Sequence, residues 1–338
     1  VQAFATYRAS VQGGAYTSTI LNIFDVYNQF NYGDVSPLAV KQMADYALAT
    51  GTPKALLLIG KGRTPDYNFY RNNQHSVINI PTYGEPGGDL MFTKGLGASD
   101  VKPALAVSRI NAYTVEHVKA YLDKVKEMEQ IPYADLFRKN VLQLSGGQSV
   151  SELTIFRGYI QSFAQVLSGD YLGGRAINLG KETSQTVEVV DVVDEINSGV
   201  GLVTFFGHSS NTVTDIEIGR VSTGDFGYAN QGKYPVFLVN GCNAGDIFGT
   251  NVSFGEDWMR TPNLGAIGFI AHANFASSSA LKRYSDIFYQ IAFAEEPTFG
   301  LTLGELQLAI SSRYFDMYGS GRLAQTQVLE MLLQGDPM

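Results

Sequence analysis

The sequence has a single cysteine, Cys242, among its 338 residues. One cysteine excludes an internal disulfide bond and any zinc site built from several cysteines. Histidine is also scarce, with only His75, His117, His208 and His272 in the chain. Chemistry that needs a thiol nucleophile and an imidazole base therefore has very few candidates.

Long apolar runs and clusters of positive charge are missing as well. The apolar stretches have the length of strands, and none reaches the roughly 18–20 residues of a membrane helix. The net charge of −8 and the pI of about 5.1 should repel nucleic acid. We therefore expect no membrane span in these residues and no nucleic-acid partner. The start, VQAFATYRAS, is not a signal peptide, so for an exported protein we expect the targeting segment outside these residues.

Glycine, tyrosine and phenylalanine are abundant, with 36, 19 and 20 residues. Together with 45% hydrophobic residues, they are typical of a sheet-containing protein with many tight turns. The length provides enough apolar side chains for one large core or two smaller ones.

Strand-like and helix-like segments alternate along the chain. This order predicts an α/β fold with a parallel sheet between two layers of helices. A stretch at 131–140 suggests two subdomains, 1–140 and 141–338. The predicted strands are 55–60, 103–108, 141–145, 201–207, 235–241 and 265–271, and the predicted helices are 36–50, 114–129, 151–168, 277–294, 302–317 and 322–333.

His208 and Cys242 each follow directly after a predicted strand, GLVTFFG and PVFLVNG. In a parallel sheet the strand ends meet at one edge, where functional groups gather. A histidine beside a cysteine can take its proton and leave a nucleophilic thiolate. Taken singly, each residue has an ordinary alternative, since a lone cysteine is often a small buried hydrophobe and a histidine is often structural.

Several segments resemble the gingipain-type family of cysteine peptidases, in the caspase-like clan. They run in order over nearly the whole chain, and the resemblance implies a caspase-like α/β fold and a peptide or protein substrate. The segments are FDVYNQFNYGDVSPLAVKQMADYA (24–47), ALLLIGKG (55–62), PTYGEPGGDLMF (81–92), PALAVSRINAYTVEHVKAYLDKVKEME (103–129), FFGHSS (205–210), FLVNGCNAGDIF (237–248) and LLQGDPM (332–338).

The resemblance implies that His208 is the catalytic histidine and Cys242 the nucleophile. It also implies an oxyanion hole formed by the backbone N–H groups of Ser209 and Cys242. Three positions depart from the family pattern. Ser209 replaces a glycine, Lys61 stands where aspartate is frequent, and Ser145 occupies the place of a glutamate that orients the histidine. We expect Ser145 to be at best a weak orienting group, because a hydroxyl does not stabilise imidazolium as a carboxylate does.

Glu152 and His272 are candidates for the specificity pocket. By the resemblance, Glu152 matches an acidic residue that would favour Lys or Arg before the cleaved bond. The more common explanation of such a residue is an acidic side chain in the first turn of a helix. His272 follows the predicted strand 265–271 and is a candidate for substrate contact.

We expect catalysis to need no cofactor, and the resemblance implies that structural calcium is a candidate ligand. The acidic loop residues that qualify have no EF-hand spacing, and such residues more often form turns and helix caps. They are Asp89, Asp100, Asp215, Asp225 and Asp246.

Three functional hypotheses remain open at this point. The first is a secreted or surface endopeptidase that forms a thioester acyl-enzyme. The second is a sortase-like transpeptidase, which shares the first half-reaction, and the third is a catalytically degenerate surface binding module. The resemblance implies a bacterial, extracellular or cell-surface protein, with a prodomain and a sorting domain outside these residues.

Overall fold

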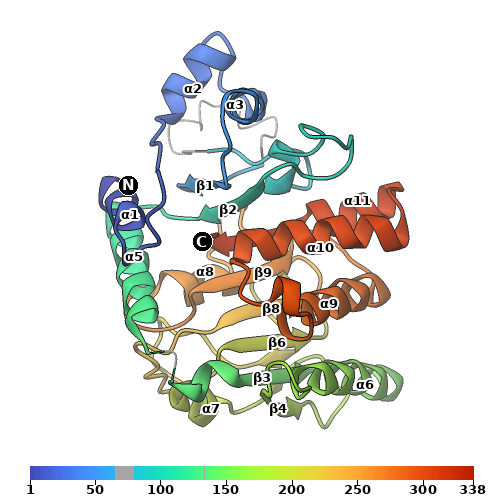
Figure 1. Cartoon of the computed structure of the whole chain (residues 1–338). Helices are drawn as coiled ribbons and strands as arrows, with labels where there is room; N and C mark the ends of the chain where they lie inside the picture. The colour runs from blue at the N-terminus through green and yellow to red at the C-terminus, as the bar shows by residue number, and fades with distance from the viewer. Residues whose placement is uncertain (65–79, 133) are drawn as a thin grey trace.

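The computed structural model describes residues 1–64, 80–132 and 134–338. Its centre is an eight-stranded sheet with the order β1-β2-β10-β9-β8-β6-β3-β4 (Figure 1). A separate two-stranded sheet pairs β5 (Glu188–Val189) with β7 (Ile216–Glu217). The strands of the main sheet are β1 (Ala55–Ile59), β2 (Ala106–Ile110), β3 (Asn140–Ser145), β4 (Arg175–Gly180), β6 (Leu202–Phe206), β8 (Val236–Asn240), β9 (Gly268–His272) and β10 (Met331–Gly335).

The main sheet is parallel except at one junction. Strand β10 pairs antiparallel with β9 and parallel with β2. As a result β1, β2 and β10 run opposite to the other five strands. Their carboxyl ends therefore lie at the opposite edge of the sheet from those of β3, β6 and β8.

Helices cover both faces of the sheet (Figure 1). Helices α6, α9, α10 and α11 pack on one face, and α5, α7 and α8 pack on the other. The helices are α1 (Gln2–Ala9), α2 (Ile23–Phe30), α3 (Pro37–Thr50), α5 (Val115–Gln130), α6 (Val150–Leu167), α7 (Val193–Ser198), α8 (Phe254–Arg260), α9 (Ser278–Phe293), α10 (Leu303–Tyr318) and α11 (Arg322–Leu329), with 3-10 helices η2 (Asp89–Phe92), η3 (Leu136–Lys139) and η4 (Glu296–Thr298).

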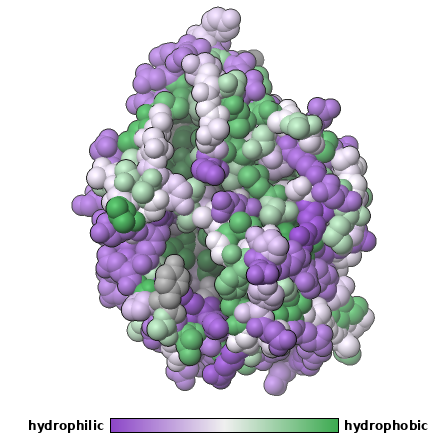
Figure 2. Space-filling view, viewed as in Figure 1, coloured by the Kyte–Doolittle hydropathy of each residue, from purple (hydrophilic) through white to green (hydrophobic). Residues whose placement is uncertain are grey.

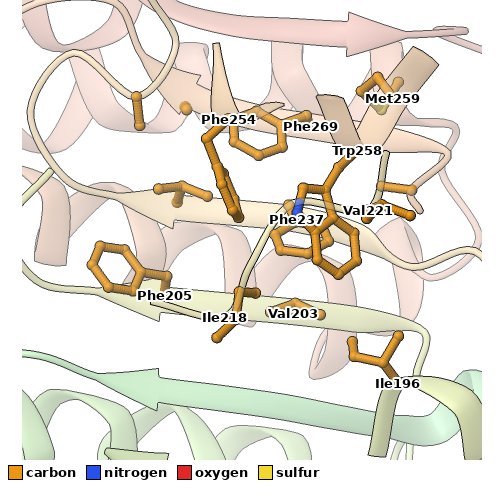
Figure 3. Packing of buried hydrophobic residues seen from close by; sticks show 14 of the residues in the cluster. Ile196, Val203, Phe205, Ile218, Val221, Phe237, Phe254, Trp258, Met259 and Phe269 are labelled. Atoms are coloured by element: carbon orange, nitrogen blue, oxygen red, sulfur yellow. The ribbon is translucent and has the colours of Figure 1, made fainter. Parts of the chain in front are cut away.

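Alternate residues of the central strands supply two separate cores, because successive side chains of a strand point to opposite faces. On the face of α8, Trp258 packs against Phe237 with ring centroids 5.0 Å apart (Figure 3). On the other face, Leu238 belongs to the core formed with α6 and α9. A strand buried on both faces reads as a continuous apolar run, as PVFLVNG does.

Helix boundaries follow recognisable signals in the sequence. Ser36 accepts a hydrogen bond from the backbone of Leu38 and precedes Pro37 at the first helical position of α3. Ser149 does the same for the N–H of Glu152 at the start of α6. The predicted helices 36–50, 114–129, 151–168, 277–294 and 302–317 are confirmed to within a few residues.

The C-terminal segment is the main error of the sequence prediction. A helix was expected over 322–333, but α11 ends at Leu329 and Met331–Gly335 form β10. The apolar run of this strand is buried on both faces, so its pattern resembles that of a buried helix. This short strand joins the two halves of the sheet.

The predicted division at residue 140 coincides with the start of β3. The sheet is continuous across the two halves, because β10 from the second half pairs with β2 from the first. The chain ends are also tied together, since the Arg8 guanidinium binds the Asp336 carboxylate at 2.6 and 2.7 Å. The two-subdomain organisation itself stays a prediction.

Hydrophilic and hydrophobic residues are interspersed over the face of the molecule in Figure 2. Within the described residues, no helix has the length and apolar character needed to cross a membrane.

Candidate active site

Cys242 lies in a loop that continues from β8. The next residue, Asn243, has a φ of 55°, in the left-handed region that asparagine tolerates better than most residues. Its backbone N–H donates to the carbonyl of Asn274 at 3.0 Å. The Cys242 side chain is partly exposed, and its Sγ lies 3.6 Å from the carbonyl oxygen of Ala276. The segment after β9 therefore holds the loop and leaves the thiol within reach of solvent.

His272 supports this loop from the inside of the protein. The residue is fully buried, and its ring nitrogens contact the carbonyls of Asn274 at 2.9 Å and Thr326 at 3.3 Å. Burial lowers the pKa of His272, and burial raises the pKa of the nearby Glu330 to about 7. The Nε2 atom of His272 is 4.0 Å from the Glu330 carboxylate. In this position the His272 side chain packs beneath the Cys242 loop, where it is shielded from substrate.

His208 follows β6, which pairs in parallel with β8 so that Phe206 lies opposite Asn240. The prediction that His208 and Cys242 follow neighbouring strands at one edge of the sheet is therefore confirmed. His208 begins a tight hairpin, in which its carbonyl accepts a hydrogen bond from the N–H of Asp215 at 2.8 Å. The imidazole packs near Phe156 of α6, with ring centroids 6.1 Å apart.

Glu152 meets the imidazole of His208. Its Oε1 atom lies 3.2 Å from Nε2 of His208, and the two side chains are 34% and 42% exposed. Nε2 is itself buried and makes no aligned hydrogen bond, so the contact is an ion pair whenever the imidazole is protonated. The other carboxylate oxygen accepts a hydrogen bond from the N–H of Gln148 at 2.8 Å. That bond and, to a lesser extent, His208 lower the pKa of Glu152.

Ser145 lies beside β4, away from the imidazole of His208. It ends β3 and is 3% exposed. Its Oγ occupies the space beside Gly180 of β4, where a Cβ would come within 2.2 Å of it. His208 follows β6, on the other side of β3. The structure thus brings Glu152 to the imidazole, whereas no hydrogen bond joins Ser145 and His208 within the described residues.

Ser209 links the two loops that carry His208 and Cys242. Its hydroxyl donates to the carbonyl oxygen of Cys242 at 2.8 Å. The hydroxyl fits because residue 241 is glycine, since a Cβ there would lie 2.1 Å from the Ser209 Oγ. In the described parts of the chain, the backbone N–H groups of Ser209 and Cys242 donate to no other group. The oxyanion hole expected from these two N–H groups stays a prediction.

No group of three or more acidic, cysteine or histidine side chains suited to a metal ion occurs among residues 1–64, 80–132 and 134–338. Asp89, one of the calcium candidates, is bound through both carboxylate oxygens to Arg109. Structural calcium stays a prediction. His117 caps the backbone of Tyr113 at 3.2 Å, and His75 falls outside the described residues.

The contact between Glu152 and His208 was not foreseen, although the sequence contains a signal for it. Ser149 and Glu152 form a Ser-x-x-Glu pattern directly after a strand and two glycines. Such a pattern starts a helix and holds the glutamate at the carboxyl end of the preceding strand. What the pattern does not reveal is that β6, and therefore His208, is the neighbour of that strand.

Comparisons with known proteins show the family of this chain. The family model of peptidase family C25 matches residues 1–338. The chain belongs to peptidase family C25, the gingipain family. As a member, it is a cysteine-type endopeptidase that acts on protein substrates. A search of curated proteins found no match to the sequence.

Solved structures support the same fold. A crystal structure of the Arg-specific cysteine proteinase gingipain R superposes with a TM-score of 0.72 at 18% identity, covering 94% of this chain and 74% of that one. A complex of the pro- and mature domains of RgpB from Porphyromonas gingivalis gives 0.74 at 18% identity, covering 99% and 75%. The caspase-like α/β fold expected from the sequence is thereby confirmed.

Proposed function

We propose that this peptidase cleaves peptide bonds with Cys242 as nucleophile and His208 as acid and base. The Cys242 thiolate attacks the scissile carbonyl carbon, and the C–N bond then breaks to leave a thioester. The protonated imidazole gives its proton to the departing amine. Water attacks the thioester, His208 takes a proton from it, and the thiol is regenerated with release of the acid product.

One observation carries this proposal. Strands β6 and β8 are parallel neighbours. His208 follows the end of β6 by two residues, and Cys242, the only cysteine of the chain, follows the end of β8 by two residues. The thiol is partly exposed. A buried thiol would instead have favoured the binding-module hypothesis, because a nucleophile needs access to its substrate.

We propose that Glu152 takes the role expected of a carboxylate partner of the histidine. Its approach to Nε2 leaves Nδ1 for the proton transfers of the reaction. The negative charge favours the imidazolium that forms when Cys242 loses its proton. Because the carboxylate is shared between Gln148 and His208, we propose no preference for Lys or Arg substrates from Glu152.

The oxyanion of each tetrahedral intermediate would be held by the backbone N–H groups of Ser209 and Cys242. Donors already fixed in place stabilise developing charge without reorganisation, and this is often the largest contribution to acyl transfer. The support is that neither N–H has another acceptor in the described residues.

The test is labelling by a thiol-reactive peptidyl probe, such as a peptidyl acyloxymethyl ketone, at pH 7. Wild type should be labelled rapidly, Cys242→Ala should not be labelled, and His208→Ala should be labelled much more slowly. Labelling that is no faster than that of a free thiol, and is indifferent to His208, would contradict the assignment of the dyad.

Transpeptidation begins with the same acyl-enzyme, so product analysis must separate it from hydrolysis. With water as acceptor, mass spectrometry of a cleaved peptide finds a free carboxylate. With an added amine, a transpeptidase yields the amide. The contact between Glu152 and His208 supports hydrolysis over the binding-module hypothesis, because it brings a carboxylate to the imidazole where Ser145 has none.

We also propose, from family membership, that the protein acts outside the cell or at its surface. An exported protein with one free cysteine fits a reactive thiol better than a structural one. Fractionation of the source cells, followed by detection of the protein in the medium or on the surface, tests this.

A further inference from the structure

A buried carboxylate lies under the turn that carries His208. Asp215 precedes β7 and is 2% exposed. Its Oδ2 atom accepts a hydrogen bond from the N–H of Gly147 at 2.7 Å. Its Oδ1 atom is buried and has no hydrogen-bond partner within the described residues. An unsatisfied buried carboxylate oxygen costs stability, so its presence calls for an explanation.

Asp215 contacts the two turns that present the imidazole and its partner. Its backbone N–H binds the carbonyl of His208 at 2.8 Å. Through Gly147 its side chain holds the turn that leads, five residues later, to Glu152. A change at Asp215 would therefore alter both sides of the pair between Glu152 and His208.

The backbone around Asp215 is shaped to admit its carboxylate. A Cβ at Gly146 would lie 2.2 Å from Oδ1, and a Cβ at Gly207 would lie 2.4 Å from it. Only glycine leaves this space, and these glycines directly follow β3 and β6. The two glycines thus provide the room that the Asp215 carboxylate occupies.

One cation faces this carboxylate. Lys181, which follows β4, is fully buried, and its Nζ is 3.8 Å from Oδ2 of Asp215. Its backbone N–H binds the carbonyl of Ser145 at 3.0 Å, so the lysine is fixed to the end of β3. Burial raises the pKa of Asp215. The backbone N–H of Gly147, the Lys181 ammonium group, and the backbone N–H and imidazole of His208 lower it. Lys181 and His208 are the charged or titratable side chains that face this carboxylate among the described residues.

We propose that Asp215 is a positioning residue for the peptidase reaction, which holds the His208 and Gly147 turns so that Glu152 meets the imidazole. The inference rests on the proposed roles of Cys242 and His208. Asp215 acts through the backbone of both turns, and its carboxylate also interacts electrostatically with His208.

The test is a double-mutant cycle with Asp215→Asn, Glu152→Gln and the combined variant. Two readouts are used, hydrolysis of fluorescein-labelled casein and alkylation of the sole cysteine by iodoacetamide as a function of pH. We expect Asp215→Asn to lower the hydrolysis rate about tenfold or more. The double variant should lose at least about fivefold less than the product of the single losses, because both changes disrupt one pair.

The pH dependence separates positioning from simple structural support. With the nearby negative charge removed, the alkaline limb of the alkylation profile should move down by at least about half a pH unit. The exposed Asp225→Asn is the matched control and should leave both readouts unchanged. Strictly multiplicative losses with an unmoved alkaline limb would overturn the proposal, as would wild-type activity in a folded Asp215→Asn protein.

If Asp215→Asn does not fold, Lys181→Gln/Asp215→Asn removes both buried charges together, which proteins tolerate better than the loss of one. Because the lost Lys181 cation offsets the lost Asp215 charge at the imidazole, the readout is then the mutant cycle of this double variant with Glu152→Gln. Losses smaller than the product are expected, and strictly multiplicative losses overturn the proposal. Failure of the underlying function looks different, since Cys242→Ala would then still hydrolyse casein. An inactive Cys242→Ala beside a normal Asp215→Asn contradicts the positioning role alone.

Discussion

Two of the regions that bury charged side chains differ in how these charges are satisfied. Beyond β1 and β2, Arg109 binds Asp89 through two nitrogens, and Lys61 and Asn111 both contact Glu256. We call these five residues the Arg109 cluster. Each of its charged side chains is less than 9% exposed and has a bonded partner.

Beyond β3, β4 and β6, the other region consists of Glu152, Lys181, His208 and Asp215, which we call the His208 cluster. Here one carboxylate oxygen has no hydrogen-bond partner, and the pair between Glu152 and His208 is partly exposed. A closed, fully bonded cluster suits a structural pair such as Arg109 and Asp89. An open cluster suits an imidazole that must gain and lose a proton in each cycle.

The largest expected effect comes from breaking the Arg109 cluster. Arg109→Met leaves Asp89 buried without its cation, and we expect a loss of about 3–5 kcal/mol in the free energy of unfolding. Urea denaturation measures this. The control is Arg313→Met, which removes a similar two-point pair with Glu295 whose side chains are 35% and 32% exposed. An exposed pair contributes about 0–1 kcal/mol, so equal losses in both variants would contradict the comparison.

The second prediction concerns the pH dependence of the same cluster. Burial lowers the pKa of Lys61 from 10.5 to about 8. Between these values the unfolded chain keeps a proton that the folded protein has lost, so stability rises with pH in this window. The buried charge thus costs stability below pH 8, and the cost disappears above pH 10.5.

Replacing Lys61 by methionine removes this dependence. From pH 7.5 to pH 10, the stability of wild type should rise relative to Lys61→Met by roughly 2 kcal/mol. Denaturation at both pH values measures the change, with the exposed Lys54→Met as control. A constant difference between wild type and Lys61→Met would show that Lys61 does not titrate in this range.

The sequence predicts features that depend on a local pattern better than features that depend on long-range pairing. His208 and Cys242 each follow a short apolar run that ends in glycine, so a local pattern locates them at strand ends. The reversed direction of β1 and β2 depends on the antiparallel pairing of β10 with β9, which links residues 331–335 to 268–272. No local pattern encodes such a pairing, and the buried run of β10 resembles a helix.

The same limit applies to the site. The sequence makes Glu152 a candidate for the specificity pocket or a first-turn acidic residue, and the structure places it in the first turn of α6. Its contact with His208 depends on the neighbouring positions of β3 and β6. Asp215 is 63 residues from Glu152 in the sequence, and only the folded sheet brings the two turns together. Spacing along the chain cannot reveal such contacts.

The third prediction tests the His208 cluster directly. Glu152→Gln removes the charge beside the imidazole but keeps an oxygen for the N–H of Gln148. We expect casein hydrolysis to fall by about 10- to 100-fold, with little change in thermal stability, since the imidazolium loses its partner. The control is Glu305→Gln, because Glu305 is also the third residue of its helix, α10, and contacts no histidine within the described residues. Equal activity of the two variants would remove Glu152 from the mechanism.

The smallest expected effect concerns the bond between the two catalytic loops. Ser209→Ala removes the hydroxyl that donates to the Cys242 carbonyl, a neutral hydrogen bond that contributes about 1 kcal/mol. Because this bond fixes the Cys242 loop relative to His208, we expect the peptidyl probe to label Cys242 about 3- to 10-fold more slowly. Ser210→Ala is the matched control, since the Ser210 hydroxyl bonds only within its own hairpin, to Thr212 and Val213. Labelling of Ser209→Ala at the wild-type rate would mean that the loops hold their positions without this bond, through backbone contacts such as those of Asn243 and Asp215.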